Sequence, residues 1–157
     1  MKYENYEKMI IERLKCPELD VRTEELTSAE LNRRRSVKPV IFVLYQGSEY
    51  EEPKELGVVA QSETMRFDVI IFSRTQRGEH GAYSAFETIT QRLLGYREKG
   101  MMTPVVFQKF GYVSEMNTFF QYALQCSFTS YIVEKHNNEE PAPLIKQIKN
   151  NLNSSVK

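Results

Sequence analysis

The amino-acid sequence predicts an α+β fold, with a mostly antiparallel central sheet of four to five strands and helices packed on one face. Two long segments, 58–74 and 119–135, show the period-two alternation of strands. Between them, apolar residues recur every three or four positions over 82–94, which is typical of an amphipathic helix. Along the chain, strands and helices do not alternate regularly enough for a parallel doubly wound sheet, so an antiparallel sheet is favoured.

The first third of the chain is expected to begin with a helix over 3–15, which Cys16-Pro17 ends because proline disfavours helix in the preceding residue. A charged stretch, 18–36, follows, and Thr27-Ser28-Ala29-Glu30 within it matches a capping box for a short helical turn. The apolar run 40–45 predicts a strand. Glycine, serine, proline and four glutamates over 47–57 predict a mobile loop.

The second half is expected to add a strand over 103–110, a turn at 111–115 and a short C-terminal helix over 143–152. We expect one domain over 1–157, with its core within about 38–135. The core positions follow from the inward side of each periodic pattern: Phe67, Val69, Ile71, Phe86, Ile89, Leu93, Leu124, Cys126 and Phe128.

Composition excludes several classes of function. The 157 residues hold 21 Lys+Arg and 21 Asp+Glu, and this zero net charge gives no general attraction to nucleic acid or to an anionic membrane. The N-terminus is polar and charged, unlike a signal peptide, and no apolar run is long enough for a membrane span. The only cysteines, Cys16 and Cys126, are predicted to be unpaired thiols of a protein made in the cytoplasm.

No pattern of catalytic residues stands out. His80 and His136 lie in predicted polar loops without a nucleophile or carboxylate at a meaningful spacing. The glycine-rich phosphate-binding motifs and zinc-ligand spacings are absent, so we expect no enzymatic activity, cofactor, metal or small-molecule substrate. A small metal-dependent nuclease stays open as an alternative, because Glu52-Pro53-Lys54 and the later Asp68 resemble part of a carboxylate site.

Three features instead indicate contact with other proteins. One is a basic stretch over 33–38, another is an acidic stretch over 49–55, and the third is the outward side of the 119–135 strand, which carries no charged residue from Gln121 to Tyr131. Cores of protein interfaces are depleted in charge, which suits that side to contact. The candidate interface residues are Arg33, Arg34, Arg35, Lys38, Glu49, Glu51, Glu52, Gln121 and Gln125.

Four short motifs, in this order and spacing, resemble the phage Mu-type tail protein family over about residues 40–135. They are the alternating strand 65–71, the helix that opens at Gly81-Ala82-Tyr83 and ends at Leu93-Leu94-Gly95, the aromatic-glycine segment 110–115, and Phe119-Phe120-Gln121-Tyr122-Ala123-Leu124.

The resemblance implies a tail terminator or tail-completion protein of a phage or prophage. Such a minor tail protein forms a ring, usually a hexamer, on the end of the tail tube and receives the head connector. Its partners would be copies of itself, the tail tube protein and the head–tail connector protein, with DNA only passing through the ring. It would act in the host cytoplasm during assembly and in the virion tail. A generic interaction module of a contractile injection or other tail structure is the alternative.

Overall fold

A computed structural model describes residues 1–24, 27–33, 37–53, 57–116 and 118–135. Arg34, Arg35, His136 and the helix expected over 143–152 lie outside the described residues. In chain order the elements are α1 (Lys2–Leu14), β1 (Asp20–Val21), α2 (Ser28–Arg33), β2 (Val40–Tyr50), β3 (Ala60–Ser73), α3 (Ala82–Leu93), β4 (Val106–Met116) and β5 (Phe119–Val133).

The five described strands form one sheet in the order β1-β2-β3-β5-β4. Only β1 and β2 run parallel; the other neighbours are antiparallel. The two strands with the clearest alternation are central and pair with each other from Ala60↔Val133 to Ser73↔Phe120. The predicted α+β class with a mostly antiparallel sheet is confirmed.

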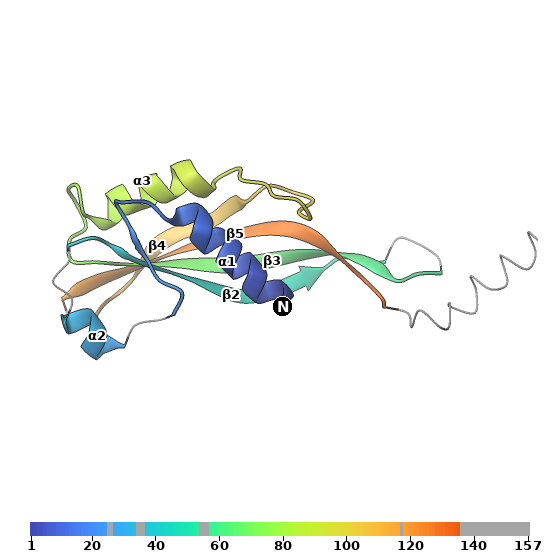
Figure 1. Cartoon of the computed structure of the whole chain (residues 1–157), viewed down its shortest axis with the longest axis horizontal. Coiled ribbons are helices and arrows are strands. Elements are labelled where there is room, and N and C mark those ends of the chain that lie inside the picture. The colour runs from blue at the N-terminus through green and yellow to red at the C-terminus, as the bar shows by residue number, and fades with distance from the viewer. Residues whose placement is uncertain (25–26, 34–36, 54–56, 117, 136–157) are drawn as a thin grey trace, which may run out of the picture.

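Helices α1 and α3 lie on the same side of this sheet (Figure 1). Ile10 and Leu14 of α1 and Ile89 and Leu93 of α3 are fully buried against it, in the main hydrophobic core cluster. Every core position predicted from the sequence belongs to this cluster; Phe86 alone is only partly buried. The rings of Phe67 and Phe128 stack at its centre, 5.4 Å between centroids.

The short helix α2 lies on the opposite side of the sheet, at one end (Figure 1), so the expectation that all helices share one face is wrong for this element. The predicted capping box holds it: the Thr27 N–H donates to Glu30 Oε2 at 2.7 Å, and the Glu30 N–H donates to Thr27 Oγ1 at 3.2 Å. Its Leu31 is buried in a second cluster with Val40, Phe42, Ile70, Phe72 and Phe119. Ile70 and Phe72 of this cluster lie on the side of β3 that is opposite α1 and α3.

Two strands run further than the sequence suggested. β2 continues through Tyr50, so residues 47–50 of the predicted 47–57 loop are strand, and β4 continues through the predicted turn at 111–115. In β2 a register shift between Tyr45 and Gly47 forms a bulge, and glycine suits the positive φ of 131° there. In β4, pairing with β5 overrides the local turn tendency of Gly111.

Both cysteines are free thiols, as predicted, and Cys126 is fully buried. Within the described ranges, no helix is long and apolar enough to cross a membrane.

Candidate assembly interface

The side of the sheet opposite α1 and α3 has no described helix over it beyond α2 (Figure 1). We call this region the open face. Period-two alternation places the even-numbered residues of β3 and the odd-numbered residues of β5 on it, together with the bulged part of β2. Its members are Gln46, Glu49, Ser62, Thr64, Arg66, Asp68, Gln125, Ser127, Thr129 and Tyr131.

The open face is polar but carries few charges. Thr64 and Thr129 share a hydrogen bond between their hydroxyls, 3.0 Å apart, across the two central strands. Glu49 and Arg66 form an exposed ion pair of 3.0 Å. A shallow cavity of about 200 Å³ lies among Gln46, Arg66, Asp68 and Gln125. Asp68 is half-buried within the subunit, and this burial raises the pKa of its carboxyl.

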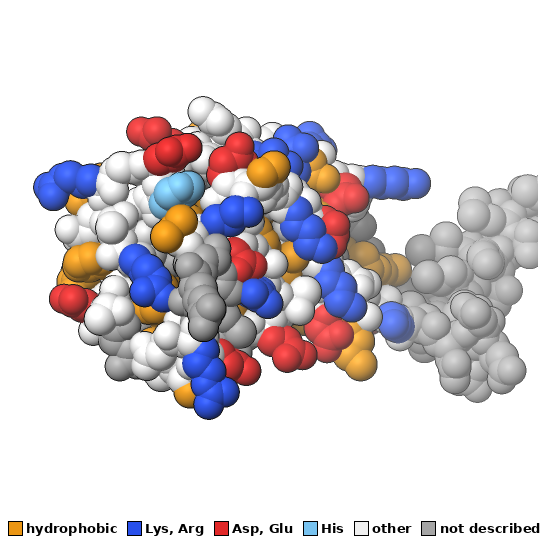
Figure 2. All heavy atoms as spheres, turned by 60° about the vertical axis from the view of Figure 1, so that its left-hand side comes forward, with side chains coloured by type: hydrophobic (Ala, Val, Ile, Leu, Met, Phe, Trp, Pro, Cys, Tyr) orange, Lys and Arg blue, Asp and Glu red, His pale blue; other side chains and the backbone are white. Residues whose placement is uncertain are grey.

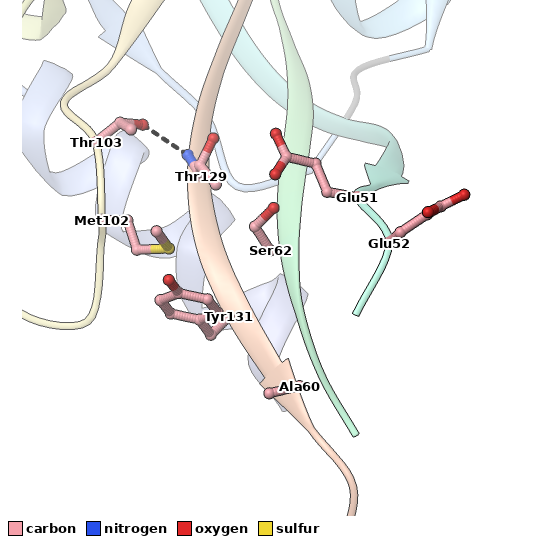
Figure 3. Close-up of a pocket in the computed structure, with 8 residues that line it drawn as sticks. All are labelled: Glu51, Glu52, Ala60, Ser62, Met102, Thr103, Thr129 and Tyr131. Carbon is pink, nitrogen blue, oxygen red and sulfur yellow. Dashed lines mark hydrogen bonds between the residues drawn. The ribbon is translucent and has the colours of Figure 1, made fainter. Parts of the chain in front are cut away.

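A larger cavity, about 330 Å³, lies on the same face near the ends of β2 and β5 (Figure 3). Ala60, Ser62, Thr129 and Tyr131 come from the two central strands, Met102 and Thr103 from the loop before β4, and Glu51 and Glu52 from the segment after β2. Ser62 Oγ is buried without a hydrogen-bond partner, the one such side-chain nitrogen or oxygen among the described residues. Buried hydroxyls are normally paired, so this atom marks an incomplete environment.

Strand β4 forms the outer edge of the sheet and pairs only with β5. Among the described residues, no backbone hydrogen bond joins β4 to an element other than β5. Val106, Tyr112 and Val113 on this strand are about half exposed. A long edge strand with apolar side chains and free backbone groups is a template for pairing with another chain, and most soluble proteins block such edges.

The structure places the two predicted charged stretches at opposite ends of the sheet. Arg33 ends α2, and Lys38 precedes β2, whereas Glu49, Glu51 and Glu52 lie at the far end of β2, roughly 30 Å away at the usual rise of a strand. Within one subunit they therefore do not meet. Figure 2 views the end that carries α2, and its described acidic and basic side chains are interspersed rather than gathered into one basic patch.

The two predicted glutamines differ in exposure. Gln125 is exposed on the open face and lines the smaller cavity. Gln121 is half-buried nearer α2, where its Oε1 accepts a hydrogen bond of 3.3 Å from Ser114 Oγ. Both lie on the uncharged side of β5, as the alternation predicted, and of the two only Gln125 is exposed to a partner.

The covered side of the sheet holds a buried carboxylate that the sequence reasoning missed. Glu63 is fully buried and accepts hydrogen bonds from Lys2 Nζ (2.6 Å), Tyr3 OH (2.8 Å), Ser48 Oγ (2.7 Å) and Tyr50 OH (3.0 Å). Burial alone raises the pKa of Glu63, but these donors outweigh it and lower the pKa to about 2. The network fastens the start of α1 to β2 and β3. A charged residue at an inward position of β3 was the signal that could have revealed it.

The residues that the sequence suggested for catalysis do not come together at one site. Glu52 borders the larger cavity and Asp68 the smaller one, while Lys54 lies outside the described residues. His80 is exposed in the loop before α3, and its backbone oxygen accepts from Ser73 Oγ at 3.0 Å. The described residues contain no group of three or more His, Cys, Asp or Glu placed to hold a metal ion.

In a comparison with known proteins, the chain matches the model of a family of phage proteins. The match covers residues 10–151, and the chain belongs to this family, the Gp37 protein family. No curated protein matches the chain. The match supports a phage structural or assembly protein, in agreement with the coarser part of the resemblance stated above.

Proposed function

We propose that this Gp37-family protein is a tail terminator: copies of it close a ring on the end of the phage tail tube, stop tube growth and join the tube to the head connector. The observation that carries the proposal is the open face, a polar sheet surface with no described helix over it beyond α2, in a chain of a phage protein family. The motif resemblance over 40–135 supports the same role.

A closed ring requires a heterologous interface, in which one surface of a copy meets a different surface of the next. Two unlike ends are present, because Arg33 lies at one end of the sheet and Glu51 and Glu52 lie at the other. Exposed ion pairs contribute only about 0–1 kcal/mol each. The free subunit is therefore expected to associate weakly and to form the ring on the tube end, where neighbours are held at high effective concentration.

Deletion of the gene from the phage or prophage tests this function. We expect headless tails whose tubes vary in length, seen by negative-stain electron microscopy, and a return to joined particles when the gene is supplied from a plasmid. Tails of normal length joined to heads in the deletion strain would show that the protein is not the terminator and that it has another assembly role.

A further inference from the structure

The open face ends in a group of apolar side chains, which we call the end patch: Ala60, Met102, Tyr131 and Val133. Tyr131 and Val133 are each 56% exposed. Ala60 lies opposite Val133 in the pairing of β3 with β5, and Tyr131 lies two residues earlier on the same side of β5. Ala60, Met102 and Tyr131 also line the larger cavity (Figure 3). A hollowed surface with exposed apolar groups is typical of a binding site for another apolar segment.

The chain itself supplies an apolar segment that follows this end of the sheet. β5 ends at Val133, and residues 136–157 lie outside the described part of the chain. Four apolar residues form the stripe of the short helix predicted over 143–152: Leu144, Ile145, Ile148 and Leu152. A helix this short is not stable alone in water, so its stripe needs a surface to pack on. The family match runs through residue 151 and therefore includes most of this segment.

The linker between β5 and this segment favours a patch on another copy. Glu140 and Ala142 each precede a proline, and a residue in that place prefers extended backbone. Packing on its own end patch would require the chain to reverse direction directly after β5, which an extended linker opposes. Residues 136–143 span up to about 26 Å when extended, which is enough to reach a subunit in direct contact.

Resting on the proposed function, we propose that the end patch of one copy binds the C-terminal segment, residues 143–152, of the next copy in the ring. Patch and segment are different surfaces of the same chain, as a heterologous contact requires. Each copy gives its segment to one neighbour and receives a segment from the other. The exchange adds apolar burial to contacts that exposed ion pairs alone would leave weak.

A nuclear magnetic resonance titration tests the segment. The receptor is ¹⁵N-labelled full-length protein with Ile148→Asp, whose own segment does not compete, and the probe is a synthetic peptide of residues 141–157. We expect saturable shifts around Thr103 and Tyr131. A peptide with Ile148→Asp should produce none, whereas Asn150→Asp, on the opposite side of the predicted helix, should leave binding unchanged. No saturable shifts, or equal shifts with the Ile148→Asp peptide, would overturn the proposal.

The patch is tested with two matched substitutions in the labelled receptor. Tyr131→Glu places a charge in the end patch and should weaken peptide binding at least several-fold. Tyr112→Glu is the control, because Tyr112 is 54% exposed on β4 outside the patch, and it should leave the affinity unchanged. Equal affinity of both variants would show that the peptide binds elsewhere and would overturn the site.

A dilution series of the wild-type protein distinguishes exchange between copies from packing within one copy. We expect the amides around Tyr131 to differ from those of Ile148→Asp at high protein concentration and to match them on dilution. A difference that persists at every concentration would show that the segment packs on its own copy, and would overturn the exchange. These measurements use purified protein and are independent of the deletion phenotype, so failure of the exchange and failure of the terminator function give separate results.

Discussion

The two sides of the sheet differ in what covers them. On the side of α1 and α3, most inward residues of β3 and β5 are apolar and buried, and the one charged residue there, Glu63, has four hydrogen-bond donors. On the open face the same strands carry Ser62, Thr64, Gln125 and Thr129, and Ser62 Oγ has no partner. One side is complete within the subunit, whereas the other has unmet hydrogen-bonding capacity. The difference supports the proposal that the covered side provides folding stability and that the open face provides contacts for assembly.

The largest effect should come from the centre of the covered side. Phe128→Ala removes a fully buried ring that stacks on Phe67, and we expect it to lower the free energy of unfolding by about 3–5 kcal/mol. Gln125→Ala, on the open side of the same strand, should change it by no more than about 0.5 kcal/mol. Urea unfolding of both variants measures the contrast. Similar losses would mean that the open face also stabilises the subunit.

The Glu63 network should give a smaller, pH-dependent effect. Because the folded pKa of Glu63 is lowered to about 2, its contribution is present above the usual carboxyl pKa and is lost as pH falls toward 2. We expect Glu63→Gln to cost roughly 2–4 kcal/mol at pH 7, and the difference from wild type to shrink steadily below about pH 4.5. Unfolding curves at a series of pH values provide the measurement. A constant difference would contradict a stabilising buried carboxylate.

The α2 capping box should have a local effect. Thr27→Ala removes the side chain that accepts from the Glu30 N–H, at a cost of about 1 kcal/mol. We expect faster amide hydrogen exchange in α2 and around Leu31, with the exchange of β3 and β5 unchanged. Ser28→Ala serves as a neighbouring control, because the Ser28 hydroxyl takes part in neither hydrogen bond of the capping box. Faster exchange across the central strands would show that α2 supports the whole sheet.

The last prediction is that a reducing agent has no effect on thermal stability. Since Cys16 and Cys126 are free thiols, a reducing agent should leave the melting temperature unchanged. Scanning calorimetry with and without reductant measures this. A drop of several degrees on reduction would indicate a disulfide, whose loss typically costs about 2–5 kcal/mol.

The sequence predicted those parts of the fold that depend on local periodicity. The alternation of 58–74 and 119–135 and the stripe of 82–94 gave the central strands, helix α3 and most of the core, because burial of one side imposes a period on the chain. The side taken by α2 and the extension of β4 through Gly111 depend on contacts between distant segments. No local pattern encodes such contacts.

The candidate interface was predicted only in part. The uncharged side of β5 was visible in the sequence as Gln121 and Gln125. The larger cavity was not, because Ser62, Met102 and Thr129 come together only through strand pairing and the loop before β4. The sequence singled out both charged stretches, but only the fold shows that they lie at opposite ends of one sheet.

Hydroxyl-radical footprinting of the free subunit and of assembled tails tests most directly whether the open face is the assembly surface. Tyr131 and Val106 are about half exposed on the open side of β5 and β4, and Leu94, at the end of α3 on the helical side, is 51% exposed. We expect oxidation of Tyr131 and Val106 to fall strongly in tails while oxidation of Leu94 stays near its level in the free subunit. Unchanged oxidation of Tyr131 and Val106, with protection at Leu94, would contradict the assignment and place the contact on the helical side.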